Sequence, residues 1–594
     1  MRPVRLLSVK TLAAIAVCMG VIAMSCAKKA ADPSPTLHTL FSEYFELQMK
    51  AWPTWATSLG DKRYDSLLAD ISSAAYDKYY TALQDYRNRL KAIDREALAD
   101  SDRVSYDIFE LRLDQSLEAK KFRDWTMPIS QQDGPHLDFP SLLNSITFVG
   151  ESDYINYHKR LLAFPRYIDQ TIDNMREGMS AKLVAAQINV EPVPAQMDKI
   201  IVTDPTKSVF YEPILANAAK LDSAALQRVA AQLHDAIANG VMPAYRKLRA
   251  FVADEYLPMC RKEYGLWALA DGAERYAYLI KYHTTLPLTP EQITEIGKRD
   301  LAEIHAQMDS IIAKVNFKGD RAKFIEFLHS DKRFYHTDPK GLVADYTAIL
   351  DSISKRMPEI FGILPKAPCL VKVIEEYRAP EATTAYYQGP AQDGSRPGVY
   401  WVNTYDLPSR PKYEMEALSF HESIPGHHLQ ISIAQELTGL PEFRKHEWFT
   451  AFGEGWALYS ERLPKELGFY SDPYSDFGRL IYEAWRASRL VVDCGIHYFK
   501  WDRQQAIDFM KANFGGTDRN IINEVDRYIA SPGQALGYKI GQNKILELRA
   551  HAQAELGAAF SLRDFHDQVL NTGCIPLTAL EKKIHEWIKT RKAA

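Results

Sequence analysis

The chain has few cysteines, and no two of them stand at the close spacing of a metal or redox motif. Only 6 of the 594 residues are cysteine, and no C-x-x-C pair occurs. Two of the six lie within the first 26 residues, and the other four are Cys260, Cys369, Cys494 and Cys574. A disulfide is compatible with an exported protein, but the sequence assigns none.

An excess of positive charge is also absent. Lysine and arginine together number 72, aspartate and glutamate 76, and the formal net charge is −4. Nucleic-acid-binding domains usually carry a basic excess, so this balance argues against a nucleic-acid partner. The apolar content of 46% and the charged content of 25% are typical of a globular protein.

Repeats of fixed period and long Gly/Ser-rich linkers are missing from the chain, and no apolar run after the N-terminus is long enough to cross a membrane. Length alone would allow several domains. Without a linker to divide the chain, we expect residues 37–594 to form a single large helical domain, with the alternative of two lobes around a cleft.

The N-terminus has the pattern of an export signal. Three basic residues precede the apolar run Leu12–Met24, which at about 13 residues is too short to span a bilayer of about 30 Å. We expect residues 1–25 to be a signal peptide. The small residues before Cys26 resemble a bacterial lipobox, so residues 26–36 would be a lipidated tether. The alternative is an ordinary signal peptide with an incidental cysteine.

A lipid on Cys26 would place the protein in the cell envelope, facing the periplasm or the exterior. The residue after this cysteine is Ala27 rather than an aspartate. By resemblance to the enterobacterial sorting rule, this favours the outer membrane.

The rest of the chain has the periodicity of a mainly α-helical protein. Apolar residues recur at three- and four-residue spacing. They do so in four segments, 76–93, 154–183, 224–256 and 290–315. The main exception is 368–404, where residues 369–374 and 398–404 have the composition of two strands separated by turn residues.

Metal-binding side chains are concentrated at residues 420–430. His421, Glu422, His427 and His428 fall within eight positions of a chain with only 16 histidines. Neutral imidazole is the commonest metal ligand, and a neighbouring glutamate can act as general base toward water on a metal. The His-Glu pair starts the H-E-x-x-H zinc-peptidase pattern, but Pro425 stands where the second histidine should be.

The proline changes which histidine can reach the metal. In a regular helix, His427 would point away from His421, and His428 would lie about 10 Å further along the axis. Pro425 and Gly426 can insert a bulge of about two residues that returns His427 to the metal side. We therefore expect His421 and His427 to be ligands and His428 to be a neighbour.

A second acidic motif, Gly453-Glu454-Gly455, follows at a suitable distance. Two-histidine zinc peptidases often take a third ligand from a glutamate on a following helix, so we expect Glu454 to complete the site. The flanking glycines allow backbones to approach closely. Glu461, two turns on, is suited to orient a histidine. The alternative is that the histidine-rich segment only caps a helix.

His421 to Gln430, Gly453 to Glu461 and Arg489 to His497 resemble the bacterial DUF885 family. That family resembles the helical gluzincin zinc peptidases, which include the angiotensin-converting-enzyme-like and oligopeptidase folds. The resemblance extends over the whole mature chain. It implies a large helical fold with a small β-sheet beside the metal helix. In helical gluzincins the edge of such a sheet pairs with an extended substrate, and 398–404 is the candidate strand. The alternative is a covering hairpin without a substrate role.

A polar stripe follows the metal motifs on an apolar helix. Arg486, Arg489, Asp493 and His497 stand at three- and four-residue steps, and buried polar groups need partners. Arg489 could bind a substrate carboxylate or pair with Glu461, and His497 could stabilise an oxyanion. For Arg486 and Asp493 an Arg-Asp bridge between helices is at least as good an interpretation.

The last candidate is Tyr538, which shares a helix face with Gln534 and Gln542. Helical gluzincins commonly use a tyrosine hydroxyl to stabilise the tetrahedral intermediate, and the resemblance implies this role for Tyr538.

Together these features predict a Zn²⁺-dependent hydrolase of peptide or related amide bonds, with Glu422 as general base. The expected partners are a peptide or small amide substrate and, through the lipid, a membrane. Two alternatives stay open. One is a binding lipoprotein without catalysis, and the other is an amidohydrolase that acts on a non-peptide compound.

Overall fold

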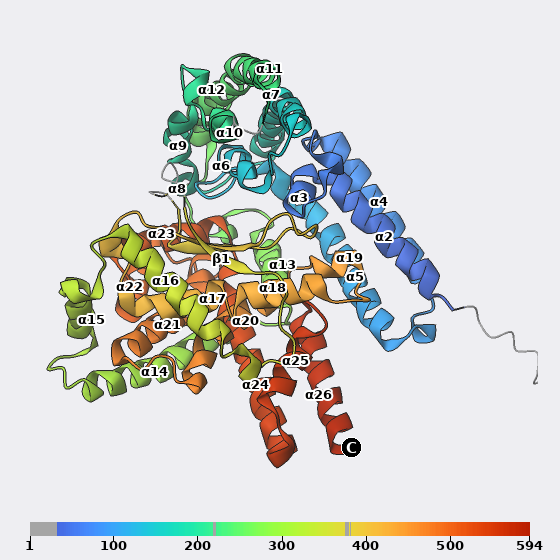
Figure 1. The fold of residues 1–594 in the computed structure, drawn as a ribbon. Helices are drawn as coiled ribbons and strands as arrows, with labels where there is room; N and C mark the ends of the chain where they lie inside the picture. Colours follow the sequence, from blue (N-terminus) through green and yellow to red (C-terminus); the bar gives the residue numbers. More distant parts are fainter. Residues whose placement is uncertain (1–31, 218–220, 375–378, 380–381, 594) are drawn as a thin grey trace, which may run out of the picture.

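The computed structural model describes residues 32–217, 221–374, 379 and 382–593. The expected signal peptide and Cys26 lie outside these ranges. Helices make up most of the described chain and one small sheet lies among them (Figure 1). The expected fold class, mainly α with a small sheet, is therefore confirmed. Within the described ranges, no helix has both the length and the apolar character needed to cross a membrane.

The helices expected from periodicity are present. Residues 76–93 fall in α4 (Ser73–Lys91), and residues 154–183 in α7 (Glu151–Ser180). The segment 290–315 is α14 (Pro290–Lys314). Its first turn is capped by Thr289, whose hydroxyl accepts the backbone N–H of Gln292 at 3.3 Å.

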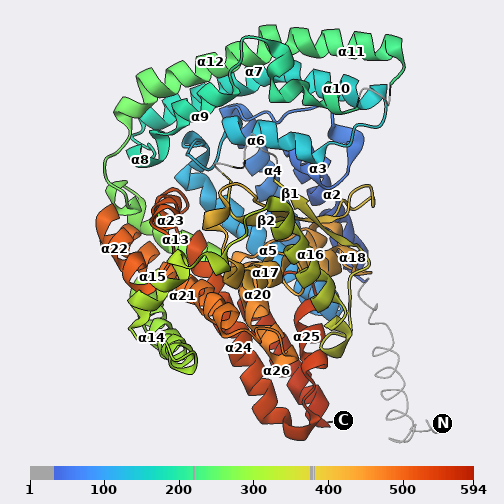
Figure 2. The ribbon, with the colours of Figure 1, turned by 60° about the vertical axis from the view of Figure 1, so that its left-hand side comes forward.

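The first half of the chain forms two groups of helices. The N-terminal group is α2 (Ser34–Ala51), α3 (Pro53–Ser58), α4 and α5 (Asp100–Ala119). The second group is α6 (Pro135–Ser141), α7, α8 (Gln187–Val190), α9 (Val193–Ile200), α10 (Glu212–Asn217), α11 (Ser223–Ala236) and α12 (Met242–Phe251). Helices α7, α11 and α12 run together across one end of the molecule (Figures 1 and 2). The second group has its own hydrophobic core, which includes Phe164, Tyr245 and Leu248.

The second half of the chain surrounds the sheet. It begins with α13 (Gly272–Thr284), α14, α15 (Arg321–Ser330) and α16 (Pro339–Ser354). After the sheet come α17 (Met415–Glu422), α18 (His427–Glu436), α19 (Glu442–Lys445), α20 (Thr450–Arg462) and α21 (Pro473–His497). The chain ends with α22 (Arg503–Asn513), α23 (Asp518–Ala530), α24 (Gly537–Leu556), α25 (Leu562–Leu570) and α26 (Leu577–Ala593).

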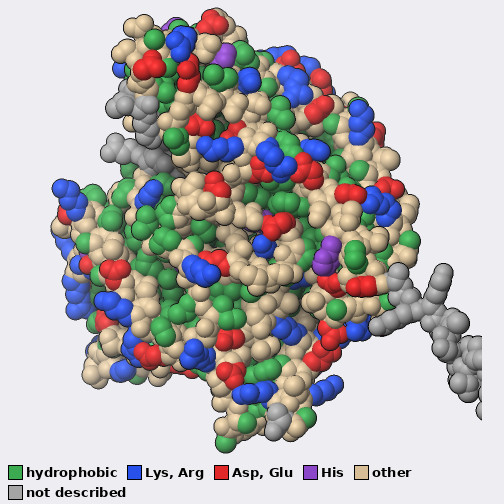
Figure 3. Space-filling view, turned by 45° about the vertical axis from the view of Figure 1, so that its right-hand side comes forward, with side chains coloured by type: hydrophobic (Ala, Val, Ile, Leu, Met, Phe, Trp, Pro, Cys, Tyr) green, Lys and Arg blue, Asp and Glu red, His purple; other side chains and the backbone are tan. Residues whose placement is uncertain are grey.

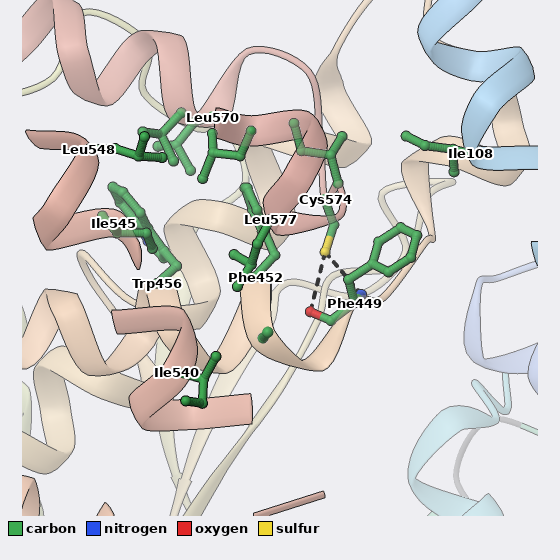
Figure 4. Close-up of a cluster of buried hydrophobic side chains, with 14 of the residues drawn as sticks. Ile108, Phe449, Phe452, Trp456, Ile540, Ile545, Leu548, Leu570, Cys574 and Leu577 are labelled. Atoms are coloured by element: carbon green, nitrogen blue, oxygen red, sulfur yellow. Dashed lines mark hydrogen bonds between the residues drawn. The ribbon is translucent and has the colours of Figure 1, made fainter. Parts of the chain in front are cut away.

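One hydrophobic core holds α20 in place. Phe452 and Trp456 of α20 pack among Ile545 of α24, Leu570 of α25 and Leu577 of α26 (Figure 4). All five side chains are buried. The apolar face of α20 is thus anchored in this core. Glu454 lies between Phe452 and Trp456 in the sequence, and its side chain points away from the core.

The sheet has the strand order β1-β3-β2, with β1 (Cys369–Val373) parallel and β2 (Ala385–Gln388) antiparallel to β3 (Gly398–Val402). Both expected strands are present, and β2 was not foreseen. Because β3 has a neighbour on each side, its residues cannot offer a free edge. The expectation that 398–404 is the substrate-pairing edge is therefore wrong, since the edges of this sheet are β1 and β2.

The surface carries charges of both signs. Lys and Arg side chains are interspersed with Asp and Glu over the face in Figure 3, as the small net charge suggests. The four cysteines in the described part of the chain are all free thiols. Cys260, Cys494 and Cys574 are buried, so in this fold they pack as small apolar residues.

Candidate metal centre

The two expected histidine ligands stand on either side of a break between two helices. Helix α17 ends at Glu422 and α18 begins at His427. Pro425, whose peptide bond to Ile424 is cis, lies in the connection. A Cβ on Gly426 would overlap the carbonyl oxygen of His421, so only glycine fits. We expected a bulge within one helix; the structure instead interrupts the helix, and His427 still turns toward His421.

Helix α20 fixes the connection between these helices. The indole Nε1 of Trp456 donates to the carbonyl oxygen of Pro425 at 2.9 Å, and the Ser460 hydroxyl donates to the same oxygen at 3.2 Å. All three residues are buried. The helix that carries Glu454 therefore also sets the position of the segment between the histidines.

Three side-chain donors converge at this point. One donor atom each of His421, His427 and Glu454 lies within 4.8 Å of the others, and all three side chains are largely buried. Nε2 of each histidine lies 3.5 Å from Oε2 of Glu454. Two ligands on a tetrahedral zinc ion, at about 2.0–2.1 Å from it, are about 3.3 Å apart. The separation thus suits a shared metal ion.

The state of the donor atoms also suits a metal. Oε2 of Glu454 is buried and has no hydrogen-bond partner within the described residues. Burial opposes ionisation of Glu454, but its contacts with His421 and His427 outweigh burial and hold the pKa well below its usual range. Two imidazole nitrogens and one carboxylate oxygen are a ligand set typical of zinc. These three residues could therefore hold Zn²⁺.

Glu461 orients the first histidine. Its Oε1 lies 2.7 Å from Nδ1 of His421 and 3.4 Å from a guanidinium nitrogen of Arg486. Burial disfavours a charged His421, yet the contacts with Glu454 and Glu461 raise its pKa to about 9. A carboxylate on Nδ1 leaves Nε2 for a metal. The prediction that Arg489 could pair with Glu461 is wrong, because Arg486 occupies that position.

Glu422, the expected general base, has its carboxylate close enough to His421, His427 and Glu454 to interact with them electrostatically. Within the part of the chain that the structure describes, no hydrogen bond or ion pair engages its carboxylate, which interacts with its charged neighbours through space only. Burial raises its pKa, and Glu454 adds to the increase, while His421 and His427 oppose it. A carboxylate with a raised pKa, free to exchange a proton, is what a general base requires.

Tyr538 lies next to His421. The two rings are nearly parallel, with centroids 6.3 Å apart and an interplanar angle of 16°. Helices α20 and α24 meet closely because Gly455 faces Gly541, and a Cβ on Gly541 would overlap the carbonyl oxygen of Ala451. This contact brings the start of α24, and Tyr538 with it, up to the helix that carries Glu454.

Arg489 lies on the other side of Tyr538 rather than at Glu461. Its guanidinium carbon is 4.4 Å from the centroid of the Tyr538 ring, a cation–π contact. The guanidinium also pairs with Glu524 at 3.1 Å and donates to the Tyr528 hydroxyl at 3.0 Å. The structure thus brings Arg489 to the site through Tyr538.

His497 is bonded to backbone at both ring nitrogens. Nδ1 accepts the N–H of Leu266 at 3.2 Å, and Nε2 donates to the carbonyl oxygen of Tyr528 at 2.9 Å. Burial lowers its pKa to about 3, so the ring is neutral. No N–H of His497 is left for an oxyanion, and we correct the catalytic role expected for it to a structural one.

Asp493 also has a structural environment. It accepts the hydroxyl of Tyr276 at 2.7 Å and the backbone N–H of Gly533 at about 3.0 Å. The expected Arg486–Asp493 bridge is wrong. Asp493 bonds to Tyr276 and Gly533, whereas Arg486 pairs with Glu461. Asp493 instead holds the turn that precedes α24.

His428 lies outside the group of three donors, and both of its ring nitrogens have other partners. Its Nε2 donates to the carbonyl oxygen of Ala367 at 3.0 Å, so Nδ1 accepts the hydroxyl of Tyr387 at 2.8 Å. Burial lowers its pKa to about 4, which keeps the ring neutral. His428 joins α18 to β2 and to the segment before β1.

One residue at the site escaped the sequence analysis. Trp448 precedes α20, and its ring centroid lies 5.7 Å from that of His427. The indole also packs on Gly453, where a Cβ would overlap it, and 37% of the residue is exposed. A tryptophan just before a helix carries no sequence signal of its own, so only the fold shows that it borders the candidate metal centre.

Two solved structures illustrate the similarity of this chain to known folds. A "putative lipoprotein" from Colwellia psychrerythraea is 28% identical, has a TM-score of 0.90, and the match covers 93% of this chain and 99% of that one. A "putative lipoprotein of unknown function" from Shewanella oneidensis is 18% identical with a TM-score of 0.71, over 92% of this chain and 99% of that one. The second likeness shows the fold alone.

A search of curated proteins finds no match. The sequence model of the family described as "Bacterial protein of unknown function (DUF885)" matches residues 53–584. This match includes the segment from His421 to Tyr538, which carries the candidate metal centre. The chain therefore belongs to the DUF885 family of bacterial proteins.

Proposed function

We propose that this chain is a zinc-dependent hydrolase of peptide or related amide bonds in the cell envelope. The observation that carries the proposal is the convergence of Nε2 of His421, Nε2 of His427 and Oε2 of Glu454 beside the unengaged carboxylate of Glu422. Each group has the chemistry that such a reaction needs, and the four come from only two short segments of the chain.

The ligand number favours catalysis over a structural metal site. Structural zinc sites are usually closed by four protein ligands, whereas catalytic sites have three and keep one position open. The described residues offer three here: His421, His427 and Glu454. A purely structural site would also have no use for Glu422 beside it.

Each residue then has a defined task. A zinc ion supplies Lewis-acid chemistry, in that it acidifies water and polarises an amide carbonyl. Glu422 accepts the proton of the attacking water and delivers it to the leaving amine. Tyr538 donates a hydrogen bond to the oxyanion that develops on the carbonyl oxygen. Glu461 keeps Nε2 of His421 directed at the centre.

The proposed location is the outer membrane of the cell envelope, with the lipid on Cys26 as anchor and the catalytic domain facing the periplasm or the exterior. The support is the basic and apolar N-terminus before Cys26, together with the similarity to the Colwellia psychrerythraea protein, which is described as a "putative lipoprotein". Cys26→Ser should release a soluble or unprocessed form; unchanged membrane fractionation and mass would contradict the anchor.

The experiment that tests the proposed reaction is a digest of a peptide library and of non-peptide amides by the purified zinc-loaded protein, read by mass spectrometry. Cleavage that a chelator abolishes and zinc restores is expected. A second sample carrying Glu422→Gln separates this activity from contaminating hydrolases, because only the wild type should produce the cleaved fragments.

A further inference from the structure

A chain of polar side chains leads from buried charges to the hydroxyl of Tyr538. Arg527 donates from one guanidinium nitrogen to Oε1 of Gln534 at 2.8 Å. Nε2 of the same amide lies 3.4 Å from the Tyr538 hydroxyl. Gln534 stands in the short turn Gln534–Leu536 that leads into α24, so it lies one helical turn before Tyr538.

The orientation of the Gln534 amide follows from its partner. A guanidinium has donors only, so the group that faces Arg527 must be the amide oxygen. The NH₂ group then faces Tyr538 and donates to the phenol oxygen. The direction of both hydrogen bonds thus follows from which groups can donate and which can accept.

The hydrogen bond from Gln534 determines where the hydroxyl proton of Tyr538 can point. A hydroxyl oxygen that accepts a hydrogen bond on one side must direct its own O–H to the other. Within the described residues, no acceptor for the O–H of Tyr538 is found, and its ring lies beside His421. The proton is therefore left for an acceptor that comes to the metal centre from outside the protein.

Glu524 fixes both Arg527 and Arg489, the arginine that packs on the Tyr538 ring. Glu524 accepts Arg527 at 2.9 Å and 3.2 Å and pairs with Arg489 at 3.1 Å. Arg489 in turn lies over the Tyr538 ring at 4.4 Å. Both arginines are thus fixed by one carboxylate, so the amide of Gln534 has little freedom to rotate.

We infer that Arg527 and Gln534 are positioning residues that direct the hydroxyl proton of Tyr538 toward the carbonyl oxygen of the substrate. This inference rests on the proposed function, because it assumes that Tyr538 serves an oxyanion at the metal centre. It adds the residues that fix the direction of donation, which would make Tyr538 a donor before the substrate arrives.

Two substitutions of Gln534 separate this role from simple packing. Gln534→Glu places a carboxylate between Arg527 and Tyr538. Because a carboxylate only accepts, it should capture the Tyr538 proton. Gln534→Met keeps the length of the side chain but neither captures the proton nor fixes it. We expect Gln534→Glu to lower kcat by about 10²-fold, as loss of an oxyanion donor does, with little change in KM. Gln534→Met should lower kcat by less than about tenfold.

A binding experiment gives a second readout that does not need turnover. Calorimetry would measure the affinity of a phosphinic dipeptide, a tetrahedral oxyanion, for the zinc-loaded protein. Gln534→Glu should weaken this binding, and Tyr538→Phe should do so as well. In the double variant the two losses should not add, since the proton can be lost only once. Gln553→Glu, on an exposed position of α24, controls for the added charge.

The outcomes are distinct. Additive losses in the double variant, or equal losses in Gln534→Glu and Gln534→Met, would overturn the inference, because packing alone would then explain them. If no amide is cleaved by the wild type, the proposed reaction fails, and the phosphinic-dipeptide measurement still decides the direction of the Tyr538 hydroxyl.

Discussion

Oε1 of Glu461, which lies about two helical turns beyond Glu454 on the same helix, is 2.7 Å from Nδ1 of His421. The helix α20 thus supplies both the proposed carboxylate ligand and the group that orients the first histidine. Such partners of metal-binding histidines typically account for 10- to 100-fold in metal affinity.

Glu461→Gln should therefore weaken zinc binding by about 10- to 100-fold while the fold persists, because the amide can still contact Nδ1 but carries no charge. Competition with a chelating dye measures the affinity. Glu466→Gln is the control, since Glu466 pairs with Arg549 at the surface of the same region. Equal affinity of the Glu461 variant and the wild type would show that Glu461 does not orient a ligand.

The two adjacent histidines of α18 should behave differently. His427→Ala should abolish zinc retention, whereas His428→Ala should keep most of it, because both ring nitrogens of His428 are engaged by Ala367 and Tyr387. Atomic absorption on dialysed protein measures the metal. If His428→Ala alone removes the zinc, the assignment of His427 as ligand is wrong.

The close contact of α20 and α24 depends on glycine. Gly541→Ala should lower the free energy of unfolding by about 3 kcal/mol, because the added methyl group overlaps the carbonyl oxygen of Ala451. It should also separate Tyr538 from Glu454. Gly150→Ala is the matched control, since nothing lies within 4 Å of a Cβ at that position. Chemical denaturation of both variants checks the difference; similar stabilities would contradict close packing.

Asp493 should make stability depend on pH. Burial raises its pKa to about 7, against 3.8 in the unfolded chain, while Tyr276 and Gly533 oppose the increase. Between pH 4 and 7 the folded state holds a proton that the unfolded state has lost. The contribution of Asp493 to the free energy of unfolding therefore decreases as pH rises through this range.

Replacement by a neutral isostere tests this sign. As the pH rises from 4 to 8, the free energy of unfolding of Asp493→Asn should increase relative to that of the wild type by on the order of 3–4 kcal/mol. Urea denaturation of both proteins at each pH measures this difference. Parallel stability curves for the two proteins would show that the carboxyl group does not stay protonated in the fold.

The sequence was most informative where chemistry and spacing act locally. The histidine pair, Pro425-Gly426 and the glycines around Glu454 lie within short segments, so their geometry follows from helix periodicity and its interruption. Glu461 could be foreseen as a partner of a histidine ligand because two helical turns beyond Glu454 is again the same face, and the structure shows that this histidine is His421.

The sequence was least informative where the contact of a side chain depends on a partner from another helix or strand. Arg486 and Arg489 are one turn apart on the same helix face, and only the placement of α20 and α23 determines which of them meets Glu461 and which meets Glu524. His497 belongs to the same polar stripe, but backbone groups satisfy it. Strand order depends on pairing between distant segments, and β2, with four residues, is too short to show a pattern.

The most direct test of the central claim combines metal content with turnover in one pair of proteins. Purified wild type should contain one zinc ion per chain and cleave an amide substrate, while Glu422→Gln should contain the same zinc and lose hydrolysis by several orders of magnitude. A Glu422→Gln protein that retains wild-type turnover, or a wild type that binds no zinc, would contradict the assignment of His421, His427, Glu454 and Glu422 to a hydrolytic zinc centre.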